Sequence, residues 1–434
     1  MIFFIKIVKL FLALAILGIA FCYRQPFLAG GRELAFVAII IVGVGLIVTE
    51  VIGFKKRLSA VSILAIASLA LCIATGLEIK FNLAKQSVLN ADIAKLENLG
   101  QHFIVGYRNF DEIKTLVSKR AIGGVFVTAR NIKNKSKQEI QQEIQALQAI
   151  RRAQGLLPLW IATDQEGGVV SRLSPPLAKL PQLSFVLDGD KNIERKKDKV
   201  IQYAATQGKD LSAIGINLNF APVVDLNKGI ISPDDKFSKI YLRSISADKE
   251  VVTKVALWYC QTLEKYGVRC TIKHFPGLGR VSADTHIADA QLHTSVAELA
   301  QDDWLPFREV MSKSPAFTML GHARLTAVDG EHPVSFSQQV IEGIIRKDWG
   351  HDGVLITDDF SMQAVYGSKD GLALATVKAI NAGVDLILIA FDKDLYYEAI
   401  DALLKAEEKG KLDRQMLDNS SKRLRTQSEY IGRF

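Results

Sequence analysis

Eight short apolar runs, separated by longer stretches with helical patterning, dominate the chain from about residue 100 onward. Runs of this kind are typical of parallel strands that are buried on both faces. Ser136 with Glu139, and Ser295 with Glu298, form capping-box pairs that mark helix starts between the runs. The pattern predicts an α/β fold, a (β/α)8 TIM-type barrel. A doubly wound open sheet is less favoured, because no glycine-rich phosphate turn follows the first run. The runs occupy residues 102–107, 124–130, 159–164, 217–225, 268–275, 316–323, 353–359 and 385–391.

Polar side chains stand at the ends of five of these runs. In a (β/α)8 barrel the carboxyl ends of all strands converge on one face, where the active sites of such barrels lie. We therefore expect these residues to form a single site. They are Asp164, Asp225, Lys273–His274, His322 and Asp358–Asp359.

The N-terminal part is almost entirely apolar, with stretches at Phe3–Tyr23, Glu33–Phe54 and Leu58–Ile79. The second and third approach the length of about 20 apolar residues that a spanning helix needs. Lys6 and Lys9 ahead of an apolar run also fit a signal peptide, although the bulky residues at its end suit cleavage poorly. We favour three retained transmembrane helices over buried core helices. The expected domains are a membrane-anchoring segment at 1–85 and a barrel at 95–425.

The basic charge of the chain belongs mostly to this segment. Its first 85 residues carry nine Lys or Arg and three acidic residues, so they hold +6 of the formal +8 and leave +2 for the rest. A nearly neutral barrel argues against a nucleic-acid partner. The expected partners are a lipid bilayer and a small substrate.

Four cysteines divide between the two parts. Cys22 and Cys72 lie in apolar stretches and are interpreted as small hydrophobic residues. Cys260 and Cys270 are ten residues apart with no metal-ligand spacing around them. A disulfide between them is possible, but nothing in the sequence supports it.

Asp358 closes the seventh run, so its carboxylate should point into the barrel mouth. An ionised carboxylate there could attack an electrophilic sugar carbon. Asp359 should point the other way if the strand pleat continues, and we expect it to cap a helix N-terminus.

Residues 272–286, "IKHFPGLGRVSADTH", place two histidines and an aspartate on one loop. Asp284 could orient the imidazole of His286 and make it a general acid and base. The alternative is a metal site formed by His274, Asp284 and His286, but it lacks a firm fourth ligand.

Four blocks, "IATDQEGGVVSRL", "LNFAPVVDLN", "IKHFPGLGRVSADTH" and "GVLITDDFSM", occur in order. Together they resemble the single-barrel β-N-acetylglucosaminidases of glycoside hydrolase family 3. The resemblance implies that Asp358 is the nucleophile and that His286, partnered by Asp284, is the acid/base. It also implies no metal and no cofactor. The implied sugar contacts are Asp164, Arg172, Arg243, Lys273 and His274.

Three positions depart from the family pattern. Leu278 replaces a histidine, Val169 stands where an arginine is common, and Leu242 replaces an aspartate. None of these removes the implied nucleophile or acid/base, so we expect an active enzyme whose fine substrate preference is unsettled.

The expected function is a membrane-anchored, retaining exo-β-N-acetylglucosaminidase that acts on peptidoglycan or muropeptides. A β-glucosidase is less favoured, because the usual ones carry their acid/base on a second domain. A catalytically silent sugar-binding protein would be expected to lose Asp358 or His286. The connector with Lys55, Lys56 and Arg57 predicts a cytoplasmic N-terminus and a barrel outside the cytoplasmic membrane.

Overall fold

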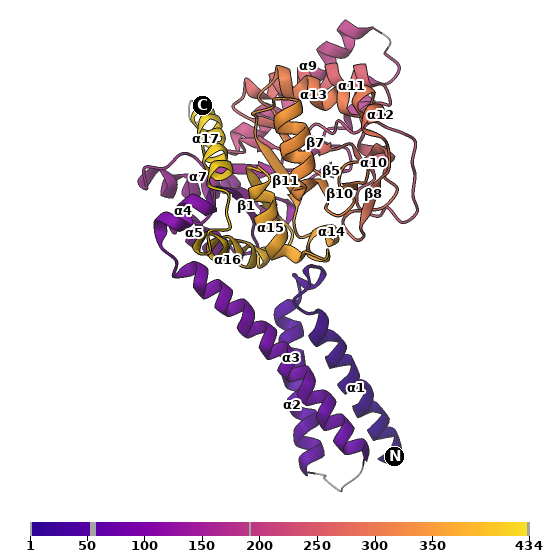
Figure 1. Cartoon of the computed structure of the whole chain (residues 1–434), viewed down its shortest axis with the longest axis vertical. Helices are drawn as coiled ribbons and strands as arrows, with labels where there is room; N and C mark the ends of the chain where they lie inside the picture. Colours follow the sequence, from indigo (N-terminus) through magenta and orange to yellow (C-terminus); the bar gives the residue numbers. More distant parts are fainter. Residues whose placement is uncertain (1, 53–57, 191, 432–434) are drawn as a thin grey trace. The chain divides into compact units, whose positions relative to one another are not determined.

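The computed structural model describes residues 2–52, 58–190 and 192–431, and it divides into two compact units, Met1–Asn90 and Ala91–Phe434. The second unit holds every candidate site residue, and Figure 1 shows both units.

The first unit consists of three long helices, α1 (Ile2–Cys22), α2 (Arg32–Ile52) and α3 (Leu58–Leu89), with a short 3-10 turn, η1 (Pro26–Leu28). Within the described residues, all three helices are long and apolar enough to cross a membrane. Helix α3 extends ten residues beyond the predicted end at Ile79, because no glycine or proline interrupts the sequence that follows.

Charged side chains inside this unit pair with one another. Lys9 Nζ lies 2.7 Å from the Glu50 carboxylate, and Arg24 lies 2.5 Å from that of Glu78. Such pairing lowers the cost of placing ionisable groups between apolar helices. The first pair connects α1 to α2, and the second connects the segment after α1 to α3.

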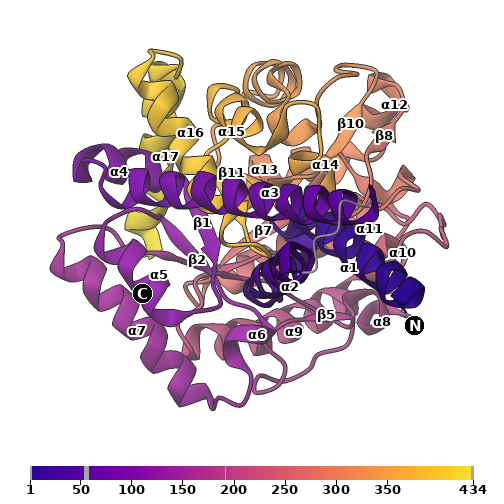
Figure 2. The ribbon, with the colours of Figure 1, turned by 90° about the horizontal axis from the view of Figure 1, so that it is seen from below.

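The second unit is a closed parallel barrel, and the predicted open-sheet alternative is excluded. Its strands follow one another around the ring in chain order, and each of the eight predicted runs contains one of them. In Figure 2 the strands occupy the middle of the unit and helices such as α5 and α7 surround them. The strands are β1 (Phe103–Gly106), β2 (Gly124–Phe126), β3 (Trp160–Thr163), β6 (Leu218–Asn219), β7 (Arg269–Phe275), β9 (Phe317–Leu320), β11 (Leu355–Asp359) and β12 (Leu386–Ile389).

A helix follows each barrel strand and covers the outside of the sheet. The predicted helix starts are confirmed, since Ser136 caps α7 in a reciprocal capping box and Ser295 accepts a hydrogen bond from the Glu298 N–H at the start of α12 (Val296–Gln301). The covering helices are α5 (Phe110–Ser118), α7 (Lys137–Ala153), α9 (Ile193–Ala213), α11 (Lys249–Glu264), α13 (Trp304–Lys313), the π-helix η4 (Gln339–Asp348), α15 (Gly371–Asn381) and α16 (Leu395–Glu408), followed by α17 (Arg414–Ile431).

Smaller elements decorate the ends of the barrel. They include a hairpin of β4 (Gln165–Gly167) and β5 (Val170–Ser171) after β3, and a parallel pair of β8 (Ala290–Leu292) and β10 (Ala323–Leu325). The short helices are α4 (Ile93–Gly100), α6 (Ala129–Ile132), α8 (Leu183–Leu187), α10 (Ile240–Arg243) and α14 (Gln363–Tyr366), with 3-10 turns η2 (Leu278–Arg280) and η3 (Val334–Phe336).

Large side chains fill the barrel interior. The rings of Phe126 and Phe220 stack with centroids 5.7 Å apart, and Trp160 meets Phe317 edge to face at 4.9 Å. A packed interior leaves the polar chemistry to the strand ends and the loops that follow them.

Cys260 on α11 and Cys270 on β7 form a disulfide, with Cα atoms 5.3 Å apart. This bond was considered possible from the sequence but was not expected. The two residues meet because α11 packs against β7, and spacing along the chain does not reveal that geometry.

Candidate active site

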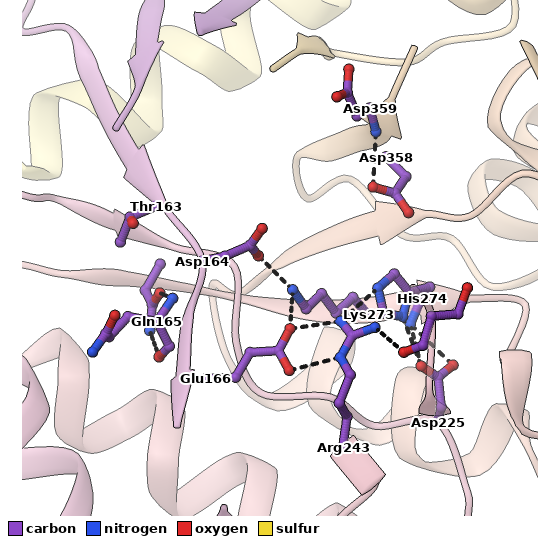
Figure 3. Close-up of polar contacts among 12 residues, drawn as sticks. Thr163, Asp164, Gln165, Glu166, Asp225, Arg243, Lys273, His274, Asp358 and Asp359 are labelled. Carbon is purple, nitrogen blue, oxygen red and sulfur yellow. Dashed lines mark hydrogen bonds and ion pairs between the residues drawn. The ribbon is translucent and has the colours of Figure 1, made fainter. Parts of the chain in front are cut away.

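A network of ion pairs connects the ends of β3 and β7. Lys273 Nζ lies 2.7 Å from Asp164 Oδ1 and 2.6 Å from Glu166 Oε1. Arg243 contacts both oxygens of Glu166, at 3.0 Å through Nε and 2.6 Å through Nη2. Figure 3 shows Glu166 between the two cations. Two cations held in fixed positions can donate to sugar hydroxyl or acetamido oxygens.

The charge state of Glu166 follows from these neighbours. Burial would raise the pKa of its carboxyl, but Arg243 and Lys273 outweigh burial and lower that pKa to about 2. Glu166 is therefore ionised at neutral pH and holds both cations in place.

His274 is fixed by a buried carboxylate. Its Nδ1 lies 2.7 Å from Asp225 Oδ2, and Asp225 also accepts from the backbone N–H of His274 and of Leu278. The other ring nitrogen, Nε2, lies 3.4 Å from Arg243 Nη2. Asp225 thus orients the imidazole towards the ion-pair network.

Asp358 lies at the end of β11, with its carboxylate directed towards this network (Figure 3). Burial raises the pKa of Asp358, but its electrostatic interactions with the imidazoles of His274, His322 and His286 and the hydrogen bond from the Asp359 N–H outweigh burial and lower the pKa to about 2. An ionised carboxylate at the barrel mouth is the form that a nucleophile needs.

Asp359 is directed away from Asp358, and the predicted helix cap is wrong. Its carboxylate accepts from the backbone N–H groups of Ser361, Ala390 and Phe391. A bulge in the pairing of β11 with β12 places Asp359 opposite Leu388, so its side chain reaches the end of β12 rather than a helix N-terminus. Asp359 anchors the strand on which Asp358 is carried.

The pair predicted in the β7 loop is formed. His286 Nδ1 lies 2.8 Å from Asp284 Oδ1, which leaves Nε2 available for proton transfer. The Asp284 carboxylate also accepts from the N–H groups of Lys236 and Phe237 and from the Ser238 hydroxyl, so it links the β7 loop to the β6 loop. These bonds, with His286, outweigh burial and lower the pKa of Asp284.

The start of this loop is fixed by close packing. A Cβ on Gly279 would lie 1.9 Å from the Leu226 carbonyl oxygen, so only glycine permits this approach of the two loops. Trp304 Nε1 donates to the Pro276 carbonyl at 3.0 Å. The backbone N–H of Gln363, five residues beyond Asp358, donates to the His286 carbonyl.

A family model for the glycosyl hydrolase family 3 N-terminal domain matches residues 89–427. The chain belongs to glycoside hydrolase family 3. It is 32% identical over 337 residues to the β-hexosaminidase A of Pseudoalteromonas piscicida, covering 72% of this chain and 54% of the relative. It is 29% identical to the β-hexosaminidase LpqI of Mycobacterium tuberculosis, covering 79% of this chain and 85% of the relative.

Among solved structures, a family 3 β-N-acetylglucosaminidase from a Paenibacillus species matches with a TM-score of 0.71 and 30% identity, covering 78% of this chain and 62% of that one. The chain thus spans little more than half the length of some of the relatives it matches.

The structure gathers most of the predicted family 3 site but not all of it. Asp164, Arg243, Lys273 and His274 share one network, whereas Arg172 is exposed after β5. Among the described residues, no side-chain hydrogen bond or ion pair joins Arg172 to that network. Its backbone N–H donates to the Asp164 carbonyl at 3.1 Å.

Glu166 was not proposed as a site residue from the sequence, where it was quoted only within its block. Asp225 and His322 were expected at the site as strand-end residues, but they were given no specific role there. Spacing offered a signal for Glu166, since residues two apart in an extended segment share a face and Asp164 was already a candidate. His322 is fixed by the Ser335 hydroxyl and the Asp359 carbonyl, and burial lowers its pKa.

The three departures from the family pattern have different surroundings. Leu278 is buried in a small apolar cluster with Ile240, Ala290 and Ala323. Val169, on the hairpin after β3, is 57% exposed. Leu242 lies in α10 next to Arg243 and is half-buried.

Proposed function

We propose that this family 3 protein is a retaining exo-β-N-acetylglucosaminidase that removes terminal β-linked GlcNAc from cell-wall fragments. Asp358 attacks the anomeric carbon and forms a glycosyl-enzyme ester while His286 protonates the departing oxygen. His286 then takes a proton from water, which releases GlcNAc and frees the carboxylate.

The observation that carries this proposal is the arrangement of two separate carboxylate–imidazole systems around Asp358. His274 with Asp225 is fixed beside the ion-pair network, while His286 with Asp284 lies on a loop and its side chain is 41% exposed. The first system suits binding of the sugar, and the second suits exchange of protons with the leaving group and with water.

The test uses the full chain with a 4-nitrophenyl β-GlcNAc substrate and a proton NMR record of the first sugar product. The proposal expects release of nitrophenol and initial formation of the β-anomer of GlcNAc. Absence of turnover contradicts the activity, and an initial α-anomer contradicts double displacement with retention.

The proposal also places 1–85 in the cytoplasmic membrane as an anchor and the barrel, at 95–425, on the extracytoplasmic side. The three apolar helices and the Cys260–Cys270 disulfide support this, because disulfides persist mainly in oxidising compartments. Lys55, Lys56 and Arg57, on which the predicted orientation rests, lie outside the described residues. Alkaline phosphatase fused after Phe434 should be active, and a reporter that fluoresces only in the cytoplasm should be dark when it is fused at the same position. An inactive phosphatase fusion together with a fluorescent reporter fusion would contradict this orientation.

A further inference from the structure

Phe237, on the loop after β6, lies beside the proposed acid/base. Its ring centroid is 5.6 Å from that of the His286 imidazole, and the two ring planes are inclined by 44°. Phe237 is also 58% exposed. Single exposed hydrophobic residues are common on protein surfaces, so the feature that distinguishes Phe237 is its contact with the imidazole.

The backbone around Phe237 is fixed by the same carboxylate that orients His286. The N–H groups of Lys236 and Phe237 donate to Asp284 Oδ2 at 3.1 and 2.8 Å. The Ser238 hydroxyl donates to Asp284 Oδ1 at 3.0 Å, and His286 Nδ1 lies 2.8 Å from that same oxygen. Asp284 is buried, so these bonds are shielded from water. The separation between the Phe237 backbone and the imidazole is therefore set before a substrate binds.

The chemistry of the proposed function puts Phe237 on the leaving-group side of the scissile bond. A general acid must lie about 3 Å from the oxygen that it protonates, so that oxygen lies next to His286. The terminal sugar occupies the other side, at the ion-pair network, where the side chains of Lys273 and Arg243 are almost completely buried. The rest of the substrate extends past the half-exposed imidazole towards water, within reach of the Phe237 ring.

A sugar ring is the group that suits this position best. The face of a phenylalanine ring is electronegative, whereas the C–H groups on one face of a pyranose are weakly positive, so the two faces attract when they stack. The hydroxyl groups of such a sugar remain in water, which fits an open surface with the exposed Lys236 beside the ring. A glycan that is shortened from its end presents a second sugar directly after each terminal GlcNAc.

We propose that Phe237 forms the leaving-group subsite, where the sugar that follows the terminal GlcNAc stacks on its ring. Phe237 is then a specificity-determining residue, and the favoured substrates are β-linked GlcNAc oligosaccharides rather than GlcNAc glycosides of small alcohols. This rests on the proposed function and narrows it to glycans with a sugar on both sides of the scissile oxygen.

The experiment compares N,N′-diacetylchitobiose with methyl β-GlcNAc as substrates of the full chain in lipid nanodiscs. Phe237→Ala should lower kcat/KM for the disaccharide by about tenfold, the size of loss expected when one stacked ring is removed. The same variant should change kcat/KM for the methyl glycoside by less than about twofold, because a methyl group is too small to cover the ring. Phe237→Tyr keeps an aromatic face and should retain the preference for the disaccharide.

Two comparisons separate stacking from a disturbance of His286. Methanol is a more basic leaving group than a sugar hydroxyl, so the methyl glycoside responds more strongly to any loss of acid assistance. Phe391→Ala is the matched control, since Phe391 is 47% exposed and follows β12, which lies four strands from β6 around the barrel. That variant should keep the wild-type ratio of the two kcat/KM values.

Failure of this inference and failure of the proposed function give different results. No hydrolysis of either substrate overturns the proposed function itself. An unchanged ratio in Phe237→Ala, or equal losses on both substrates, leaves the activity standing and overturns the stacking role. A loss of the disaccharide preference in Phe391→Ala or Phe237→Tyr as large as in Phe237→Ala also overturns it.

Discussion

The proposed sugar side and the proposed acid/base side of the site are held together by different means. On the sugar side, Glu166 and Asp164 bind Lys273 and Arg243 in a network whose cations are almost completely buried. On the acid/base side, a single carboxylate, Asp284, anchors an imidazole that is 41% exposed. In the first arrangement the charged side chains are already fixed in position before the substrate binds. In the second, the exposed imidazole can exchange protons with water.

The largest effect is expected where the two sides meet, at Asp358. Asp358→Ala should lower kcat by about 10³-fold or more, because it removes the carboxylate that is proposed to form the glycosyl-enzyme ester. Added azide should partly restore turnover of an activated substrate and give the α-glycosyl azide, since it enters from the face that the carboxylate vacates. A variant with more than a few per cent of wild-type activity would contradict the assignment.

The role of His286 is tested with substrates whose leaving groups differ in basicity. His286→Ala should slow hydrolysis of alkyl glycosides by about 10²–10⁴-fold but affect dinitrophenyl glycosides far less, because a weakly basic oxygen leaves without protonation. Asp284→Asn should give a milder form of the same pattern. Equal losses on both substrates would indicate that His286 positions the substrate and transfers no proton.

On the sugar side the expected change is in stability as well as rate. Glu166→Gln removes the anion between two buried cations and should lower the free energy of unfolding by about 3 kcal/mol. Chemical denaturation at neutral pH measures this, and a loss well under 1 kcal/mol would show that the network is not a stabilising element.

The pH dependence of that difference follows from the pKa of Glu166. Folding lowers it from 4.5 to about 2, so the stabilisation is complete above 4.5 and is lost as the pH falls towards 2. The stability gap between wild type and Glu166→Gln should therefore be constant down to about pH 5 and narrow below it. A gap that widens in acid would contradict this sign.

The smallest effect is expected at Arg172. Its exposed side chain is not held in the network, so Arg172→Ala should raise KM by about three- to tenfold and leave kcat nearly unchanged. A loss in kcat as large as that of His286→Ala would place Arg172 among the groups that act in the transition state.

The sequence predicted the parts of the molecule that depend on local pattern. All eight barrel strands were located by their apolar runs, and the side chains at their ends were expected to converge. The Asp284–His286 pair was also predicted, because the two residues lie close in the chain.

What the sequence did not reveal depends on contacts between distant segments. Glu166 and Arg243 form an ion pair although they lie 77 residues apart, and Cys260 and Cys270 form a disulfide. Both contacts can be predicted only when it is known which elements pack together. Asp359 was predicted to cap a helix, but the bulge in β11 places its side chain at the end of β12. The alternation of side chains along a strand does not predict where such a bulge occurs.

The central claim, that Asp358 forms a covalent bond to the sugar at a site prepared by the network, is tested most directly by trapping the intermediate. A 5-fluoro β-GlcNAc fluoride carries a good leaving group and slows hydrolysis of the ester, so the glycosyl-enzyme should accumulate. Mass spectrometry of the digested protein should find the fluorinated sugar on Asp358. The same label should form in His286→Ala, because fluoride leaves without protonation, unless that variant fails to bind the reagent. Labelling of Asp359, Glu166 or another carboxylate, or turnover of substrate with no trapped ester under these conditions, would contradict the account.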